Sequence, residues 1–166
     1  ERYNDFLSSD IGKRNVSKKH TGGTTGVAFE YFLDMEFWAF NWAMKMHTYN
    51  QAGYIPGKHK IGVLAGGSLL PQDGMSIKSK LWRYIQNVYS MPITRMNEGI
   101  LDEYESNLLK LKIKFLRGYP TSVYTLAKHI IRKGNTLPLK AIFTTAEMLY
   151  PHQREVIEKA FDCKIF

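Results

Sequence analysis

The sequence is poor in cysteine and in long apolar runs, and each shortage excludes a class of protein. Cys163 is its only cysteine, so neither an internal disulfide nor a zinc site built from cysteines can form. A lone thiol fits a reducing cytoplasm, which is the compartment that we predict. The most apolar helical stretch, residues 37–46, contains Asn41 and Lys45 and falls far short of the roughly 18 apolar residues that a membrane span requires.

Several catalytic signatures are absent as well. There is no Gly-x-Ser-x-Gly turn for a nucleophilic serine, no cysteine-histidine pairing and no Walker A loop. The five histidines have no metal-ligand spacing, and we interpret each as a surface or packing residue: His20, His47, His59, His129 and His152.

Acidic residues are missing from one long segment, residues 106–146. This segment holds eight basic residues, which equals the whole net charge of +8: Lys110, Lys112, Lys114, Arg117, Lys128, Arg132, Lys133 and Lys140. Such a surface can attract a nucleic acid or a phosphate-bearing small molecule. It is also the pattern of a solvated helix face, or of the margin of a domain whose other part lies elsewhere.

The length of 166 residues and the 44% hydrophobic content are those of one globular domain, residues 1–166. The chain begins at Glu1 rather than at a methionine, and it stops at an apolar strand-like stretch, residues 163–166. We therefore expect a piece of a longer protein.

Strand and helix patterns alternate along most of the chain. A strand at 14–19 leads into a glycine-rich loop, and a second strand at 27–33 returns from it. Asp34 then caps a helix that runs to Gln51, whose aromatic residues surround it and predict burial on more than one side: Phe37, Trp38, Phe40 and Trp42. Residues 68–97 are expected to be irregular, with a short helix or strand around 82–88.

The remaining segments favour an α/β fold. Strands are predicted at 60–65, 113–118, 139–143 and 164–166, and helices at 100–111, 120–134 and 151–161. This alternation indicates right-handed βαβ units around a mostly parallel sheet flanked by helices.

The glycine-rich loop, residues 20–26, is the stretch around which the function can be organised. Glycine lets successive N–H groups turn inward and threonine hydroxyls add neutral donors, so the loop could cradle a phosphate. The same composition also suits a plain turn.

In a parallel sheet, ligands bind at the carboxyl ends of the strands. Three stretches follow predicted strands in this way: residues 66–68, 118–120 and 144–147. Glu147 in the last stretch is either a site residue or a solvated acidic residue of a turn.

Together these motifs resemble the adenylate-forming (AMP-binding) enzymes. The loop of Thr21, Gly22, Gly23, Thr24, Thr25 and Gly26 is similar to their phosphate loop. Residues 117–122 (Arg-Gly-Tyr-Pro-Thr-Ser) and 142–150, followed by 153–155, look like the phenylacetate-CoA ligase branch, which includes relatives labelled capsular polysaccharide biosynthesis proteins or deazaflavin-coenzyme adenylating synthetases. The similarity covers residues 20–166 and implies part of the large N-terminal domain, without the C-terminal lid.

The resemblance implies a two-step reaction. A carboxylate attacks the α-phosphate of ATP with Mg²⁺ present, and coenzyme A or another acceptor then displaces AMP from the acyl-adenylate. Residues 21–26 would hold the β and γ phosphates, and Gly118 and Tyr119 would wall the acyl pocket. Four residues would border the adenine and the acyl group: Thr144, Thr145, Ala146 and Glu147.

The sequence also departs from the family pattern. The usual Lys-Pro pair after the loop is replaced by Val27 and Ala28. The family's magnesium-binding glutamate and lid lysine would fall beyond Phe166, so we expect no metal ligand within this chain and no adenylation by it alone. The alternative from another class is a nucleic-acid-binding or protein-interaction module that uses the basic segment 106–146.

Overall fold

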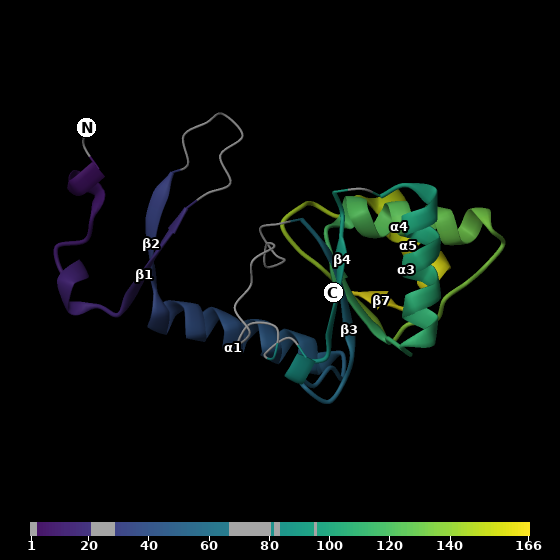
Figure 1. The fold of residues 1–166 in the computed structure, drawn as a ribbon, viewed down its shortest axis with the longest axis horizontal. Coiled ribbons are helices and arrows are strands. Elements are labelled where there is room, and N and C mark those ends of the chain that lie inside the picture. The colour runs from purple at the N-terminus through teal and green to yellow at the C-terminus, as the bar shows by residue number, and fades with distance from the viewer. Residues whose placement is uncertain (1–2, 21–28, 67–80, 82–83, 95) are drawn as a thin grey trace. The chain divides into compact units, whose positions relative to one another are not determined.

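The structure is a computed structural model that describes residues 3–20, 29–66, 81, 84–94 and 96–166. It consists of two compact units, Glu1–Thr48 and Tyr49–Phe166 (Figure 1). Within the described residues, no helix combines the length and the apolar character needed to cross a membrane.

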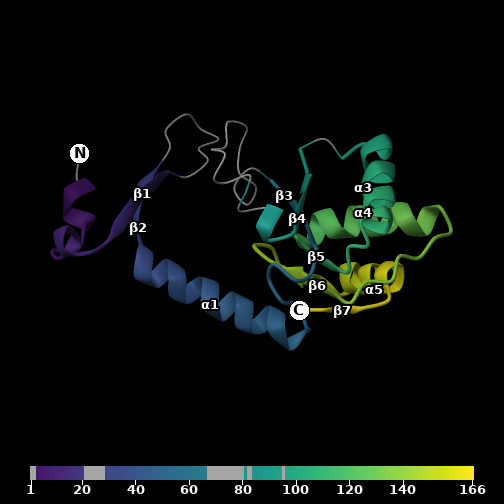
Figure 2. The ribbon, with the colours of Figure 1, turned by 60° about the horizontal axis from the view of Figure 1, so that its bottom comes forward.

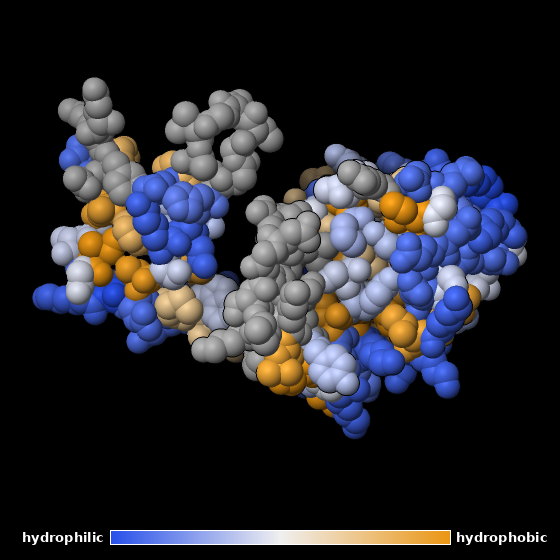
Figure 3. All heavy atoms as spheres, viewed as in Figure 1, coloured by the Kyte–Doolittle hydropathy of each residue, from blue (hydrophilic) through white to orange (hydrophobic). Residues whose placement is uncertain are grey.

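The N-terminal unit is built on a β-hairpin. Two short 3-10 helices, η1 (Tyr3–Phe6) and η2 (Ile11–Lys13), precede β1 (Val16–His20), which pairs antiparallel with β2 (Glu30–Asp34). The two strands therefore lead into and out of the glycine-rich loop, as the sequence predicts. Hydrophobic side chains of this unit gather in one region (Figure 3), and they line a hollow of about 840 Å³.

Helix α1 (Met35–Gln51) begins where the sequence predicts, since the Asp34 Oδ1 atom accepts a hydrogen bond from the Glu36 amide at 2.9 Å. The predicted burial of its aromatic residues is wrong for the described chain. Phe37 is 60% exposed and Phe40 is 62% exposed, whereas Trp38 and Trp42 stack on each other with ring centroids 6.2 Å apart. These aromatic residues pack along the helix rather than under a second described element.

The C-terminal unit contains a parallel five-stranded sheet in the order β4-β3-β5-β6-β7. The strands are β3 (Ile61–Ala65), β4 (Val88–Pro92), β5 (Phe115–Gly118), β6 (Ala141–Thr144) and β7 (Lys164–Ile165). Figure 2 shows β5, β6 and β7 side by side. The predicted α/β class with a mostly parallel sheet is confirmed.

Three helices, α3 (Glu98–Lys110), α4 (Pro120–Arg132) and α5 (Pro151–Phe161), lie on one side of this sheet (Figure 1). Leu64, Leu116 and Ile142 point toward them and are fully buried. The α4 face that meets the sheet consists of Val123, Leu126, Ala127 and Ile130, all with no exposed area. Burial of this apolar surface is the main force that holds the helices on the sheet.

The opposite side of the sheet carries an aromatic cluster. Phe115 and Phe143 project there from adjacent strands, and Tyr49 stacks on Phe143 with a centroid separation of 3.8 Å. Tyr54 meets Phe115 edge-on at 5.2 Å. Burial raises the pKa of Tyr54 to about 12, with a smaller contribution from the Tyr49 hydroxyl.

Candidate functional site

Strands β3, β5 and β6 end at the same edge of the sheet, which we call the carboxyl edge. Their register places Leu64 beside Gly118 and Gly118 beside Thr144. The loops that follow the strands begin at Gly66, Tyr119 and Thr145. The sheet therefore brings together two of the three stretches that the sequence singles out, residues 118–120 and 144–147.

Two hydrogen bonds join these motifs. The Thr145 amide donates to the Gly118 carbonyl at 3.2 Å, and the Thr121 amide donates to the Glu147 Oε2 atom at 3.1 Å. The second bond matters because Tyr119, the residue before α4, provides no side-chain cap for that helix. Glu147 therefore satisfies one of the free N–H groups at the start of α4, where a carboxylate also interacts favourably with the helix dipole.

Gly118 is required by a close approach of two backbones. A Cβ atom at this position would lie 2.7 Å from the Leu64 carbonyl oxygen and 3.0 Å from the Val123 Cγ2 atom. The next residue, Tyr119, lies next to β3, because its Cε2 atom is 4.0 Å from the position of a Cβ atom built on Gly66. The Gly-Tyr-Pro motif thus lets α4 start directly against β3 while the tyrosine ring lies beside Gly66.

The 144–147 loop contains a strained residue. Ala146 has a φ angle of 67°, in the left-handed region that residues other than glycine rarely adopt. Thr144 is held on the side away from β5, where its amide donates to the Phe166 carbonyl at 2.9 Å. Ala146 and Glu147 are exposed, so the end of this loop lies at the surface.

The candidate phosphate loop, Thr21, Gly22, Gly23, Thr24, Thr25 and Gly26, lies outside the described residues, as do Gly67 and Ser68. What the structure brings together is therefore the pair of motifs around Gly118, Tyr119, Thr144, Thr145, Ala146 and Glu147.

Arg117 lies close to these motifs, although the sequence predicts no role for it in the site. It pairs with Phe143 across β5 and β6, on the side of the sheet that carries the aromatic cluster. Within the described chain its Nε atom is buried without a hydrogen-bond partner. Burial raises the pKa of the nearby Tyr49 hydroxyl, and the charge of Arg117 opposes that rise. A buried N–H of this kind can bind a carboxylate or phosphate oxygen. The sequence alone does not distinguish Arg117 from the other basic residues of segment 106–146.

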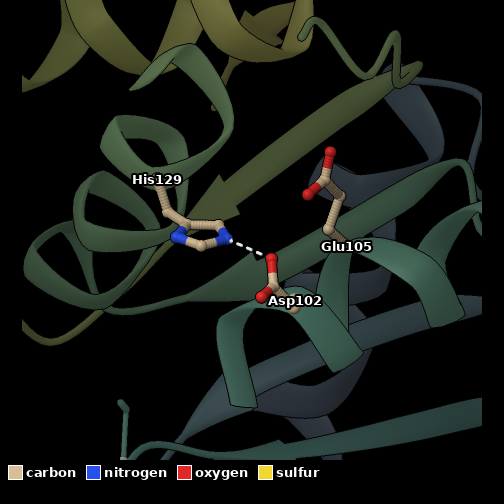
Figure 4. Close-up of side chains that lie close together, drawn as sticks. All are labelled: Asp102, Glu105 and His129. Atoms are coloured by element: carbon tan, nitrogen blue, oxygen red, sulfur yellow. Dashed lines mark hydrogen bonds and ion pairs between the residues drawn. The ribbon is translucent and has the colours of Figure 1, made fainter. Parts of the chain in front are cut away.

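A second cluster that sequence reasoning missed joins α3 to α4. It consists of Asp102, Glu105 and His129 (Figure 4). Each of these side chains has an atom that could bind a metal, and the three atoms lie within 4.8 Å of one another. The Nζ atom of Lys133 lies 2.7 Å from both carboxylates, so this site already contains a cation. We therefore interpret the cluster as an ion-pair network rather than a metal site.

The network has a defined proton arrangement. Arg132 can only donate, so the His129 Nδ1 atom accepts from it at 3.2 Å, and His129 Nε2–H donates to Asp102 at 2.9 Å. The pKa of Asp102 is lowered by its bonds to Lys133 and His129. For Glu105, burial opposes ionisation, but the bonds from Lys133 and Asn135 outweigh it and lower the pKa.

The comparisons with known proteins agree with this geometry. No protein-family model matches the sequence. Protein CapK of Staphylococcus aureus is 28% identical over 160 residues, which cover 92% of this chain and 34% of CapK. The fold is similar to a 2-hydroxyisobutyryl-CoA ligase in an open conformation, solved with 2-HIB-AMP and CoA, at a TM-score of 0.57 and 17% identity over 90% of this chain and 32% of the ligase.

The chain thus resembles part of the large N-terminal domain of an acyl-CoA ligase. A second structure of the same ligase, in the postadenylation state with 2-HIB-AMP, gives a TM-score of 0.57 and 16% identity over 90% of this chain and 31% of that one. The predicted resemblance to adenylate-forming enzymes is confirmed at the level of the fold. The chain spans about a third of the length of these proteins.

Proposed function

We propose that this chain is part of an enzyme that activates a carboxylic acid with ATP and transfers the acyl group from the adenylate to coenzyme A, in the manner of the phenylacetate-CoA ligases. The observation that carries the proposal is the joined pair of motifs, residues 118–121 and 144–147, at the carboxyl edge of a ligase-like sheet. The activity is that of a longer protein, since the chain spans about a third of its relatives. A cytoplasmic location belongs to the same proposal.

Each motif has a proposed part in binding. Thr144, Thr145, Ala146 and Glu147 border the adenine and the acyl group, and the exposed residues of this loop, Ala146 and Glu147, are accessible to a ligand. Gly118 and Tyr119 form a wall of the acyl pocket, with the tyrosine ring beside Gly66. Glu147 acts as a positioning residue, because its carboxylate holds the start of α4.

The phosphates of ATP are assigned to Thr21, Gly22, Gly23, Thr24, Thr25 and Gly26. Amides and hydroxyls in this loop provide neutral donors that can follow the triphosphate as it binds and leaves. Positioning of the acid against the α-phosphate, together with neutralisation of the developing charge, is the main requirement of the reaction.

We infer that the two joined motifs do not form a Mg²⁺ site by themselves, because they contain a single carboxylate. Glu147 is the carboxylate of the two joined motifs, and it already accepts a hydrogen bond from α4. The carboxylates of Asp102 and Glu105 bind Lys133 instead. If the reaction uses Mg²⁺, as the resemblance implies, its ligands belong to other residues of the protein.

The proposal can be tested by measuring pyrophosphate release. The natural-length protein is incubated with ATP, Mg²⁺ and a panel of aryl and aliphatic carboxylic acids, and an acid that stimulates release identifies the substrate class. Addition of coenzyme A then tests the acceptor, since the acyl-CoA product should form only in its presence.

Two threonine pairs make a matched comparison. Replacement of Thr24 and Thr25 by alanine should reduce acid-dependent pyrophosphate release at least tenfold, because it removes two phosphate donors. Replacement of Thr48 and Thr136, which are exposed and outside both motifs, should leave the rate within about twofold. A natural-length protein that never releases pyrophosphate with any acid would refute the proposed function.

A further inference from the structure

A second concave site lies at the opposite edge of the sheet, where β3, β5 and β6 begin. We call this edge the amino edge. A hollow of about 480 Å³ opens at this edge. Six lysines surround this hollow, which we call the polybasic pocket: Lys58, Lys60, Lys110, Lys112, Lys114 and Lys140.

Sheet register brings three of the lysines into one row. Lys60, Lys114 and Lys140 each directly precede a strand, and the residues that follow them pair across the sheet, Ile61 with Phe115 and Phe115 with Ala141. Adjacent strands lie about 4.8 Å apart. The row is also tied together through the backbone, since the Lys140 amide donates to the Lys114 carbonyl at 2.7 Å.

Two of the ammonium groups are fixed in position. Lys60 Nζ donates to the Leu111 carbonyl at 3.1 Å, and Lys114 Nζ donates to the Pro138 carbonyl at 3.2 Å. Each ammonium has three donors, so two remain on each for a ligand. Lys110 ends α3 and Lys112 follows in the left-handed conformation with a φ angle of 54°, so the chain turns sharply beside the pocket.

No acidic residue lines the pocket, and no ion pair joins its lysines to any carboxylate of the described chain. Lys133 in the same unit differs from the pocket lysines, because it forms ion pairs with two carboxylates. Lysines that line one hollow repel one another, and a bound anion reduces that repulsion.

His59 also lines the pocket. His59 packs beside Phe115 with ring centroids 5.3 Å apart, and its Nδ1 atom accepts a hydrogen bond from the Ile55 amide at 3.0 Å. Its Nε2 atom therefore carries the proton in the neutral ring. The pocket thus combines lysine ammonium groups with an imidazole ring.

We propose that the polybasic pocket binds a compact anion with several phosphate groups, such as pyrophosphate or a short oligophosphate. The lysines converge on a hollow instead of following a line, which favours a compact ligand over an extended nucleic acid. The other basic residues of segment 106–146 lie elsewhere: Arg117 within the sheet, Lys128 over the Tyr124 ring, and Arg132 and Lys133 in ion pairs. Strands of four and five residues separate the pocket from the carboxyl edge by about 13–16 Å.

The test measures tripolyphosphate binding to the protein by calorimetry. Lys114→Gln with Lys140→Gln should weaken binding at least tenfold, because both lysines belong to the row at the strand starts. Lys128→Gln with Lys159→Gln makes the same change in net charge outside the pocket, and this control should alter binding by less than about twofold. Lys58→Gln with Lys112→Gln tests the other side of the pocket in a second variant.

Two further probes separate the sources of phosphate. Cosedimentation with phosphatidylcholine vesicles containing phosphatidylglycerol tests a lipid surface, and a single-stranded oligonucleotide tests a nucleic acid. Saturable tripolyphosphate binding that requires the pocket lysines supports the proposal. Equal weakening in the control variant, absence of saturable binding, or pocket-dependent binding of vesicles or oligonucleotide alone would overturn it. The outcome is independent of pyrophosphate release at the carboxyl edge.

Discussion

The two edges of the five-stranded sheet differ in chemistry although the same strands form both. At the carboxyl edge, backbone groups and one carboxylate join the Gly118 and Thr144 loops through hydrogen bonds. At the amino edge, six lysines line a pocket without an ion pair to a described carboxylate. Hydrogen bonds therefore hold the loops together at the carboxyl edge, whereas the amino edge carries lysines without ion pairs to described carboxylates.

This difference indicates how each edge responds to substitution. Groups that bind one another in the folded state are costly to remove singly, because the remaining partner loses its hydrogen bond. Cations that repel one another contribute little to stability and are available to a ligand. Substitutions at the carboxyl edge should therefore change mainly the stability of the fold. Substitutions at the amino edge should change mainly the binding of a ligand.

The largest expected effect is at Gly118. Replacement by alanine should cost about 3 kcal/mol in free energy of unfolding, because the added Cβ meets the Leu64 carbonyl oxygen at 2.7 Å and backbone cannot easily move. Urea denaturation measures the change. Gly99→Ala is the control: Gly99 lies in α3 with its nearest neighbour at 3.8 Å, so this variant should gain about 0.5–1 kcal/mol. Equal stability of the two variants would refute the close approach.

A smaller effect is expected when a paired lysine is compared with an unpaired one. Lys133→Met should cost about 2 kcal/mol, because it leaves the buried Glu105 carboxylate without its cation. Lys114→Met, at the amino edge, should change the free energy of unfolding by less than about 0.5 kcal/mol. A cost at Lys114 as large as that at Lys133 would contradict the distinction between the edges.

Two variants of Glu147 distinguish whether this residue stabilises the start of α4 through its hydrogen bond or through its charge. Glu147→Ala should cost about 1 kcal/mol of unfolding free energy, since it removes the acceptor for the Thr121 amide. Glu147→Gln keeps an acceptor oxygen and should recover most of that loss in thermal unfolding. If both variants lose the same stability, the carboxylate acts through its charge and not through the hydrogen bond.

Acid should weaken the α3–α4 network by a small amount. The pKa values of Asp102 and Glu105 are lowered in the fold, so their contribution to stability is present above the ordinary carboxyl pKa and is lost as the pH falls through the lowered values. The free energy of unfolding should therefore decrease once the pH drops below about 4. Denaturation between pH 3 and 6 should show a shallower fall in Lys133→Met, and an identical slope would contradict this origin.

The sequence predicted the order of strands and helices because βαβ periodicity is local. Asp34 and Pro120 lie at helix starts as expected, and β3, β5 and β6 fall within two residues of their predicted bounds. Strand β4 lies within residues 68–97, which the sequence predicts to be irregular, and it ends at a proline, Pro92. It is tolerated there since β4 is an edge strand and Pro92 is its last residue.

The site was predicted in part. The motifs at Gly118 and Thr144 follow strands in the sequence, so their convergence could be deduced from topology. The cap formed by Glu147 and the strain at Ala146 depend on the exact path of two loops. The row of Lys60, Lys114 and Lys140 depends on strand register, which composition alone does not reveal.

Amide hydrogen exchange of the natural-length protein, with AMP and separately with tripolyphosphate, tests the central claim most directly. AMP should slow exchange in residues 118–121 and 144–147 and leave residues 110–115 unchanged. Protection by AMP at the amino edge, or none at residues 118–121 and 144–147, would contradict the assignment of the adenylate site to the carboxyl edge.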